Sequence, residues 1–183
     1  MQTNIKHIIY NLVIALAMTL FFSCKNDFKS VSKIGVAAYD PVGVGDSINL
    51  KFTDSGKVKA NLLSPKVYDY SNRQHSYSEF TEGVTLYIYE NNEKNTILSD
   101  YAIVNNTTDL IDLRGNVIIV TATNDSLFTE QLYYDKENKW VFNNEPVQFK
   151  SKEYVTNGIG FDSDEAFTKI EVLDVTGQFA VLD

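Results

Sequence analysis

The sequence alternates between short apolar runs and polar turn clusters from Asp46 to the end of the chain. Each run has four to seven residues rich in Val, Ile, Tyr, Phe and Thr, as in residues 84–89, and residues 90–95 form a typical polar cluster. β-branched and aromatic residues favour strands, whereas Asn, Asp and Gly favour the turns between them. The pattern therefore predicts an antiparallel all-β domain with short hairpin connections.

A weak internal repeat assigns the two faces of these strands. Residues 98–105 align with residues 128–135 at an offset of 30, and residues 109–111 align with 139–141 and 169–171 at the same offset. Because side chains alternate between the faces of a strand, the aligned strands share one apolar face. We expect this face to line the interior, either as an ordinary sandwich core or as a groove between two sheets that is open along one side. It contains Val84, Leu86, Ala102, Val104, Val117, Ile119, Leu132, Tyr134, Val147, Phe149, Ile159 and Phe161.

The first 23 residues have the organisation of an export signal, with Lys6 ahead of an apolar stretch of 15 residues. Such a stretch is shorter than the roughly 20 residues that a helix needs to cross a bilayer. It ends in Phe21-Phe22-Ser23-Cys24, which resembles a bacterial lipoprotein cleavage box with Cys24 as the acylated residue. We expect a signal peptide at 1–23, a flexible tether at 24–45 and a β domain at 46–183. An uncleaved short membrane helix and a free buried thiol are the alternatives.

The charge and the scarcity of reactive residues exclude several classes of protein. The chain has 16 Lys and Arg against 24 Asp and Glu, and residues 1–23 hold one Lys and no acid, so the remainder has 15 − 24 = −9. This balance argues against nucleic-acid binding, which relies on clustered Lys and Arg. The single cysteine cannot form an internal disulfide, and with two histidines it leaves no Cys-rich metal site.

Candidate catalytic and binding side chains are few, and we predict no enzyme, no metal and no cofactor. His75 lies in a polar stretch and is expected in an exposed loop, and Trp140 is expected in the core rather than on a sugar-stacking surface. No GxxxxGK[ST] phosphate loop occurs. Five acids that could be read as paired catalytic carboxylates are interpreted as solvated turn acids. They are Asp100, Asp109, Asp112, Glu130 and Asp135.

Several segments together resemble the LptC family of lipopolysaccharide-export proteins. Residues 79–89 resemble that family's aromatic, Gly and Val strand opening, and residues 109–117 end in its Arg-Gly-Asn-Val. Tyr134 is a departure, because Trp is common there in relatives. The lipoprotein-type front end is another, because many relatives keep a membrane-spanning helix. The remaining matching segments are residues 99–103, 127–135, 145–147 and 158–164 with Phe167.

The resemblance implies a single twisted, open antiparallel β-jelly roll built of stacked hairpins, held in the periplasm at the inner membrane. Such a protein would receive lipopolysaccharide from an inner-membrane ABC transporter and pass it to a downstream jelly-roll protein. The acyl chains would lie in a groove lined by Phe80 and the twelve inward residues named above, since a chain at −9 repels the lipid's phosphates. The rival is a lipid-anchored surface lipoprotein that binds a glycan or a protein. The edges expected to join the two protein partners contain Ile48, Leu50 and Phe52 at one end and Ile170, Val172 and Phe179 at the other.

Overall fold

The computed structural model divides the chain into two units, residues 1–38 and 39–183. It describes His7, residues 40–90 and residues 93–181, with side chains as far as Thr176. The expected signal peptide, Cys24 and most of the expected tether therefore lie outside the described residues. Within the described ranges, no helix has the length and apolar character that a membrane span requires.

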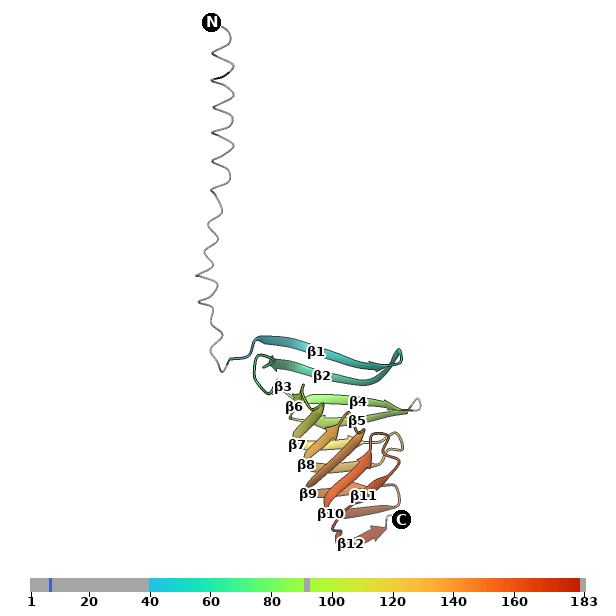
Figure 1. Ribbon diagram of the computed structural model, residues 1–183. Coiled ribbons are helices and arrows are strands. Elements are labelled where there is room, and N and C mark those ends of the chain that lie inside the picture. The colour runs from blue at the N-terminus through green and yellow to red at the C-terminus, as the bar shows by residue number, and fades with distance from the viewer. Residues whose placement is uncertain (1–6, 8–39, 91–92, 182–183) are drawn as a thin grey trace. The chain divides into compact units, whose positions relative to one another are not determined.

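The second unit consists of strands joined by turns, which confirms the all-β prediction (Figure 1). All of the pairings are antiparallel, and the twelve strands form one continuous sheet. The strands are β1 (Gly43–Asp54), β2 (Lys57–Asp69), β3 (Tyr77–Phe80), β4 (Val84–Glu90), β5 (Glu93–Ser99), β6 (Tyr101–Asn105), β7 (Leu110–Val120), β8 (Ser126–Asp135), β9 (Trp140–Lys150), β10 (Tyr154–Asp164), β11 (Ile170–Val172) and β12 (Thr176–Val181).

The long strands belong to two arms of this sheet at once. One half of β7 pairs with β5 and the other half with β6, while β2 pairs with β4 over one half and with β3 over the other. We call the arm that contains β4 and β5 the first arm, and the arm that contains β3 and β6 the second arm. Both arms continue through β8, β9 and β10, whose pairings also change register midway. This arrangement is a jelly roll, as expected.

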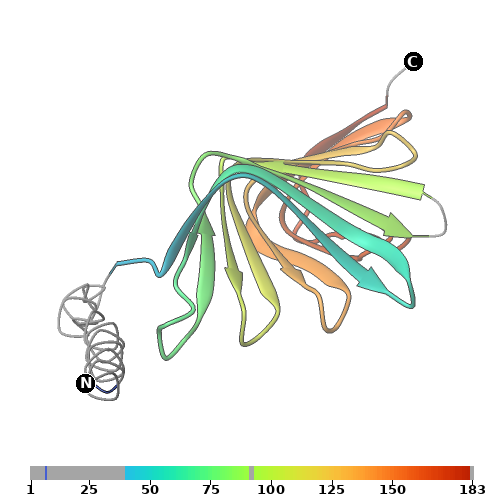
Figure 2. The ribbon, with the colours of Figure 1, turned by 90° about the horizontal axis from the view of Figure 1, so that it is seen from above.

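The arms meet along a corner, where each long strand bends (Figure 2). At the corner the backbone has positive φ at Ser47 of β1, at Gly115 and Asn116 of β7 and at Gly160 of β10. The bends are tied together across strands, since Gly83 N donates to Asp100 O at 2.9 Å and Asp100 N donates to Gly115 O at 3.0 Å. We call the opposite side, where the arms end in hairpin turns, the mouth.

Strand β1 starts three residues ahead of the expected start of the domain, so residues 43–45 belong to the strand and not to a tether. Gly43 pairs with Asp69 and Gly45 pairs with Val67. A Cβ on Gly45 would lie 2.9 Å from Ile48 Cδ1 and 3.1 Å from Val67 Cγ1. The glycines that make this stretch look like a linker therefore allow close packing of β1 against β2.

The prediction for Ile159 is wrong, because this side chain is 46% exposed on the outer face. The pairing of β10 with β9 shifts between Ile159 and Phe161, and Gly160 has a φ of +91°. A bulge of this kind adds one residue and reverses the alternation of faces beyond it. Phe161 therefore points inward as expected, while Ile159 points outward. Leu173 packs beside Gly160, and a Cβ atom added to Gly160 would lie 3.1 Å from Leu173 Cδ1.

Candidate functional site

The interior between the two arms is lined mostly by apolar side chains, with a minority of buried polar ones that includes Thr129, Asn143, Thr156 and Ser163. Of the thirteen residues predicted to face it, all except Ile159 are buried. Both arms contribute, for example Leu86 and Val117 from the first arm and Leu132 and Phe161 from the second. Nine further apolar residues are buried without having been assigned from the sequence: Ala60, Leu62, Ile88, Ile97, Ile111, Leu113, Leu127, Val141 and Phe167. All of these except Phe167 lie in strands, where extending the same alternation would have found them.

The mouth is closed by a few contacts between the arms. Asn95 of β5 donates from Nδ2 to the carbonyl oxygen of Ala166, in the turn after β10, at 3.4 Å. Its Oδ1 accepts a hydrogen bond from the N–H of Ala122 at 2.9 Å, within its own arm. On the second arm, the Lys136 ammonium lies 4.8 Å from the ring centroid of Phe52 on β1. These polar and cation–π contacts are the links that any separation of the arms would break.

The turn between β10 and β11 places Phe167 inside the mouth. Asp164 organises this turn, because its Oδ1 accepts hydrogen bonds from the N–H of Thr168 at 2.7 Å and of Lys169 at 3.2 Å. The Thr168 hydroxyl donates to the other carboxylate oxygen. Phe167 has a φ of 57°, which bulky side chains seldom adopt, and is buried in the same cluster as the groove residues. The turn is therefore built to hold an aromatic ring between the arms.

Among the thirteen residues predicted to line the groove, Tyr134 is the one whose side chain carries a polar group. Its hydroxyl donates to Glu165 Oε2 at 2.9 Å, and Lys139 Nζ lies 3.0 Å from Glu165 Oε1. Burial raises the pKa of Tyr134 well above its ordinary value, and the neighbouring charge of Glu165 raises it further. The hydroxyl thus stays protonated at physiological pH and fastens β8 to the turn that carries Phe167.

Trp140 is not a core residue, because its side chain is 37% exposed. It begins β9, and Val141 beside it occupies the inward position. The indole N–H of Trp140 donates to Asp162 Oδ1 at 3.2 Å on the outer face of the second arm. His75 is exposed in the turn between β2 and β3, as predicted.

Four of the five acidic side chains singled out in the sequence contact other groups, and within residues 40–90 and 93–181 no two of the five are hydrogen-bonded to each other. Asp100 Oδ2 accepts from the Asn116 amide at 2.6 Å at the corner. Asp112 accepts from Arg114 and Gln131, Asp109 pairs with Lys136, and Asp135 accepts from Asn138. Glu130 is exposed on β8. These contacts fit stabilisation of strands and turns.

Two sheet edges lie where the sequence predicted them. Among the described residues β1 pairs with β2 alone, so its other side is unpaired along its length. Ile48 and Phe52 pack partly on the core, and Leu50 between them is 43% exposed. At the other end, β11 and β12 pair with different halves of β10, and Ile170 and Val172 pack partly on the core. The side chain of Phe179 lies outside the described residues.

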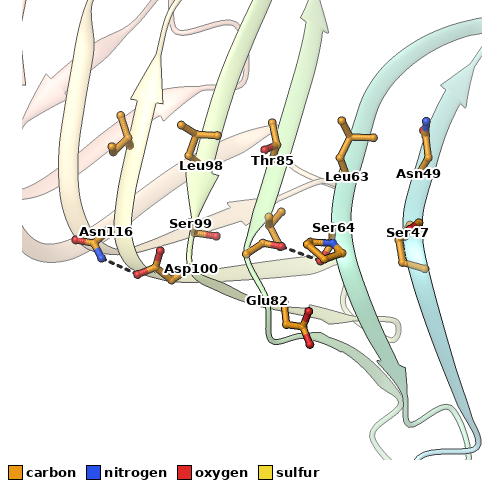
Figure 3. A pocket seen from close by; sticks show the side chains of 15 residues that line it. Ser47, Asn49, Leu63, Ser64, Glu82, Thr85, Leu98, Ser99, Asp100 and Asn116 are labelled. Carbon is orange, nitrogen blue, oxygen red and sulfur yellow. Dashed lines mark hydrogen bonds between the residues drawn. The ribbon is translucent and has the colours of Figure 1, made fainter.

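A hollow of about 720 Å³ lies on the outer side of the corner (Figure 3). Its floor is a row of paired residues across four strands, from Asn49 through Leu63 and Thr85 to Leu98. Two hydrogen bonds border the hollow. One runs from the Asn116 amide to Asp100, and the other runs from Ser64 Oγ to Gly83 O at 2.7 Å. Polar Asn49 and Thr85 alternate with apolar Leu63 and Leu98 along this row, so the outer face is mixed in character.

The whole domain also matches a known family. A family model described as Lipopolysaccharide-assembly, LptC-related covers residues 12–180. The chain belongs to the LptC-related family. This confirms the resemblance drawn from the strand motifs, whereas no match was found among curated proteins.

Family membership places this LptC-related protein in lipopolysaccharide export, as a binding and transport component of the export machinery. It also associates the protein with the inner membrane on the periplasmic side. The rival assignment, a surface lipoprotein for glycans or proteins, is not favoured by this match.

Acid is expected to loosen the mouth of this LptC-related protein through Asp164. Burial raises the pKa of Asp164, but hydrogen bonds from Thr168 and Lys169 outweigh burial and lower the pKa overall. A carboxyl with a lower pKa in the folded state adds stability above its unfolded pKa, and this stability is lost as the pH falls through the folded value. We expect the thermal unfolding midpoint to stay constant between about pH 6 and pH 8. It should decrease when the pH is lowered below about 4.

Asp164→Asn should lower the unfolding midpoint at pH 7 and make it less sensitive to acid. Some sensitivity remains, because hydrogen bonds also lower the pKa values of Glu90 and Asp135. Thermal unfolding at several pH values, compared with Asp125→Asn in another exposed turn, tests this expectation. Equal acid sensitivity of Asp164→Asn and the native chain would contradict it.

Proposed function

We propose that this protein accepts lipopolysaccharide from the inner-membrane ABC transporter, shields its acyl chains between the two arms and passes the lipid to the next jelly-roll protein. In this proposal Cys24 is acylated after removal of residues 1–23, and residues that follow it tether the domain to the inner membrane. The observation that carries the proposal is the mainly apolar interior to which both arms contribute, in a chain of the LptC-related family.

The chemistry of the interior supports acyl chains as the cargo. Leu86, Val117, Ile119 and Leu132 are fully or almost fully buried and carry no polar atoms in their side chains. Burial of about twelve methylenes would contribute on the order of 10 kcal/mol relative to water, at roughly 0.8 kcal/mol each. Most of this free energy cancels when the lipid moves between two similar interiors. An apolar interior can therefore hold the lipid without trapping it.

Loading requires the arms to separate, because the inward side chains pack on one another. The mouth is the favourable place for this separation. Its links are the hydrogen bond from Asn95 to Ala166, the contact of Lys136 with Phe52 and the insertion of Phe167. A neutral hydrogen bond contributes about 0.5–1.5 kcal/mol and a cation–π contact about 0.5–1 kcal/mol at an exposed site. The corner is instead bridged by backbone hydrogen bonds and stays as the hinge.

Photo-crosslinking in cells tests the proposal. A photoreactive amino acid at Leu86, Val117 or Ile119 is expected to label lipopolysaccharide, and labelling should require ATP hydrolysis by the transporter. Ile118 is the matched control, because it lies between two of these residues on the opposite face of β7. Adducts are read as mobility shifts that carry lipopolysaccharide. Absence of lipid adducts at all three inward positions, or equal labelling from Ile118, would refute the proposal.

A further inference from the structure

A second hollow lies on the first arm near the mouth, around the β1–β2 hairpin. It encloses about 1000 Å³ and is lined by Lys51, Lys57, Val58, Lys59, Asn61, Tyr89 and Glu90. Three of these seven residues are lysines, although the whole chain has a net charge of −8. The hollow is thus a local positive site on an acidic protein.

The positive charge of this lysine hollow is only partly neutralised. Lys59 Nζ lies 2.7 Å from Glu90 Oε2, and this hydrogen bond lowers the pKa of Glu90, which stays ionised. Lys51 and Lys57 are exposed, and within residues 40–90 and 93–181 neither forms an ion pair. Two lysine ammonium groups therefore remain available to an anion in a hollow large enough for a sugar-sized group.

Asn61 adds an independent indication of a ligand. Its Oδ1 is buried and has no hydrogen-bond partner in the protein, although the residue lines the hollow. A buried polar atom without a partner costs free energy, so a group that satisfies it is favoured. The oxygen is an acceptor, so its missing partner is a donor, such as the hydroxyl or amino group of a sugar. Tyr89 supplies an aromatic ring to the same wall.

The position of the hollow relates it to the interior. Lys51 and Asn61 pair with each other across β1 and β2, and the next pair along these strands, Phe52 and Ala60, belongs to the inward row. At the mouth, Lys136 of the second arm lies over the ring of the same Phe52. Because adjacent residues of a strand point to opposite faces, the hollow lies on the outer face of the first arm, at the rim near the mouth.

We propose that the lysine hollow binds a phosphate group carried on the sugar headgroup of the lipid. The inference rests on the proposed function for the identity of the amphiphile. Acyl chains between the arms would leave the polar headgroup at the mouth, where Lys51 and Lys57 contact its phosphate and Asn61 contacts a sugar hydroxyl or amine. Charge repulsion by the acidic surface elsewhere then restricts the headgroup to this rim.

Titration with small soluble probes tests the site separately from transport. The full chain is kept in a nonionic detergent and titrated with glucosamine 1-phosphate, inorganic phosphate and glucosamine, with amide NMR shifts as the readout. We expect saturable shifts in β1 and β2 with the sugar phosphate, weaker binding of either fragment, and weakening with salt. Lys51→Gln/Lys57→Gln should weaken binding roughly tenfold, in line with two partly exposed charge contacts.

The matched control is Lys150→Gln/Lys152→Gln, which removes the same charge from exposed positions at the β9–β10 turn. It should leave the affinity unchanged. Equal binding of inorganic phosphate and glucosamine 1-phosphate would overturn the headgroup assignment. Unsaturable shifts, or equal losses in the two double variants, would overturn the site itself. Because these probes have no acyl chain, such a result is distinct from a failure of the lipid crosslinks inside the groove.

Discussion

Replacing Leu50 with aspartate is expected to detach this protein from its membrane transporter while leaving the domain folded. Leu50 lies on β1, the strand whose outer side is unpaired among the described residues, and its side chain is 43% exposed. It pairs with Leu62, which is fully buried, so it belongs to the inward row of the first arm. The interior therefore reaches solvent at this residue.

A partner strand added to β1 would extend the sheet and cover Leu50. Unpaired edges offer backbone donors and acceptors to another chain, and natural proteins protect long apolar edges that have no partner. Val44, also exposed on β1, adds to the apolar character of this edge. A buried aspartate in the joint would be costly, so we expect the affinity to fall roughly 30-fold or more, equivalent to about 2 kcal/mol.

Titration of the detergent-solubilised transporter with each variant measures this loss. Ile159→Asp is the matched control, because Ile159 is exposed to a similar degree but lies away from β1. The downstream jelly-roll protein is expected to bind at the C-terminal edge, so Leu50→Asp should leave its affinity unchanged. Full transporter binding by Leu50→Asp, with a native unfolding midpoint, would rule out this edge as the joint.

Alternation along the strands was sufficient to predict the interior, because both arms bury the same face of consecutive strands. It failed at Ile159, where Gly160 introduces a bulge and reverses the phase. Trp140 was misplaced for a different reason. Its hydrophobic ring suggested the core, but counting back by two from Val147 reaches Val141 and leaves Trp140 outside. Burial of the smaller residues fixes which face of β9 points inward, and this places Trp140 on the outer face despite its large apolar ring.

The contacts at the mouth could not be predicted from the sequence. Asn95 and Ala166 are 71 residues apart, and each lies in a polar segment that looks like an ordinary turn or strand end. Phe167 lies in a turn, where no periodic pattern marks it as buried. The lysine hollow could not be predicted either, because the negative net charge conceals three lysines that the β1–β2 hairpin brings together. Such features depend on how the arms meet.

Joining the two arms across the mouth is expected to abolish lipid loading. Phe52→Cys and Lys136→Cys place a thiol on each arm at the site of the cation–π contact, and a short bismaleimide can bridge them. The bridged protein should remain folded, because the bridge maintains a contact already present. Since the inward side chains pack on one another, acyl chains cannot enter unless the arms separate. We expect lipid crosslinks from Val117 to fall to background after bridging.

The matched control places the same bridge within one arm. Asp109→Cys replaces Phe52→Cys as the partner of Lys136→Cys, because Asp109 and Lys136 pair between neighbouring turns of the second arm. This bridge should leave lipid loading unchanged, and each single variant treated with bismaleimide reports any reaction at Cys24, the sole native cysteine. Undiminished loading in the protein bridged across the mouth would mean that the lipid enters elsewhere. The sheet edges at β1 and β11 would then be the remaining openings, because the corner is held by backbone hydrogen bonds between strands.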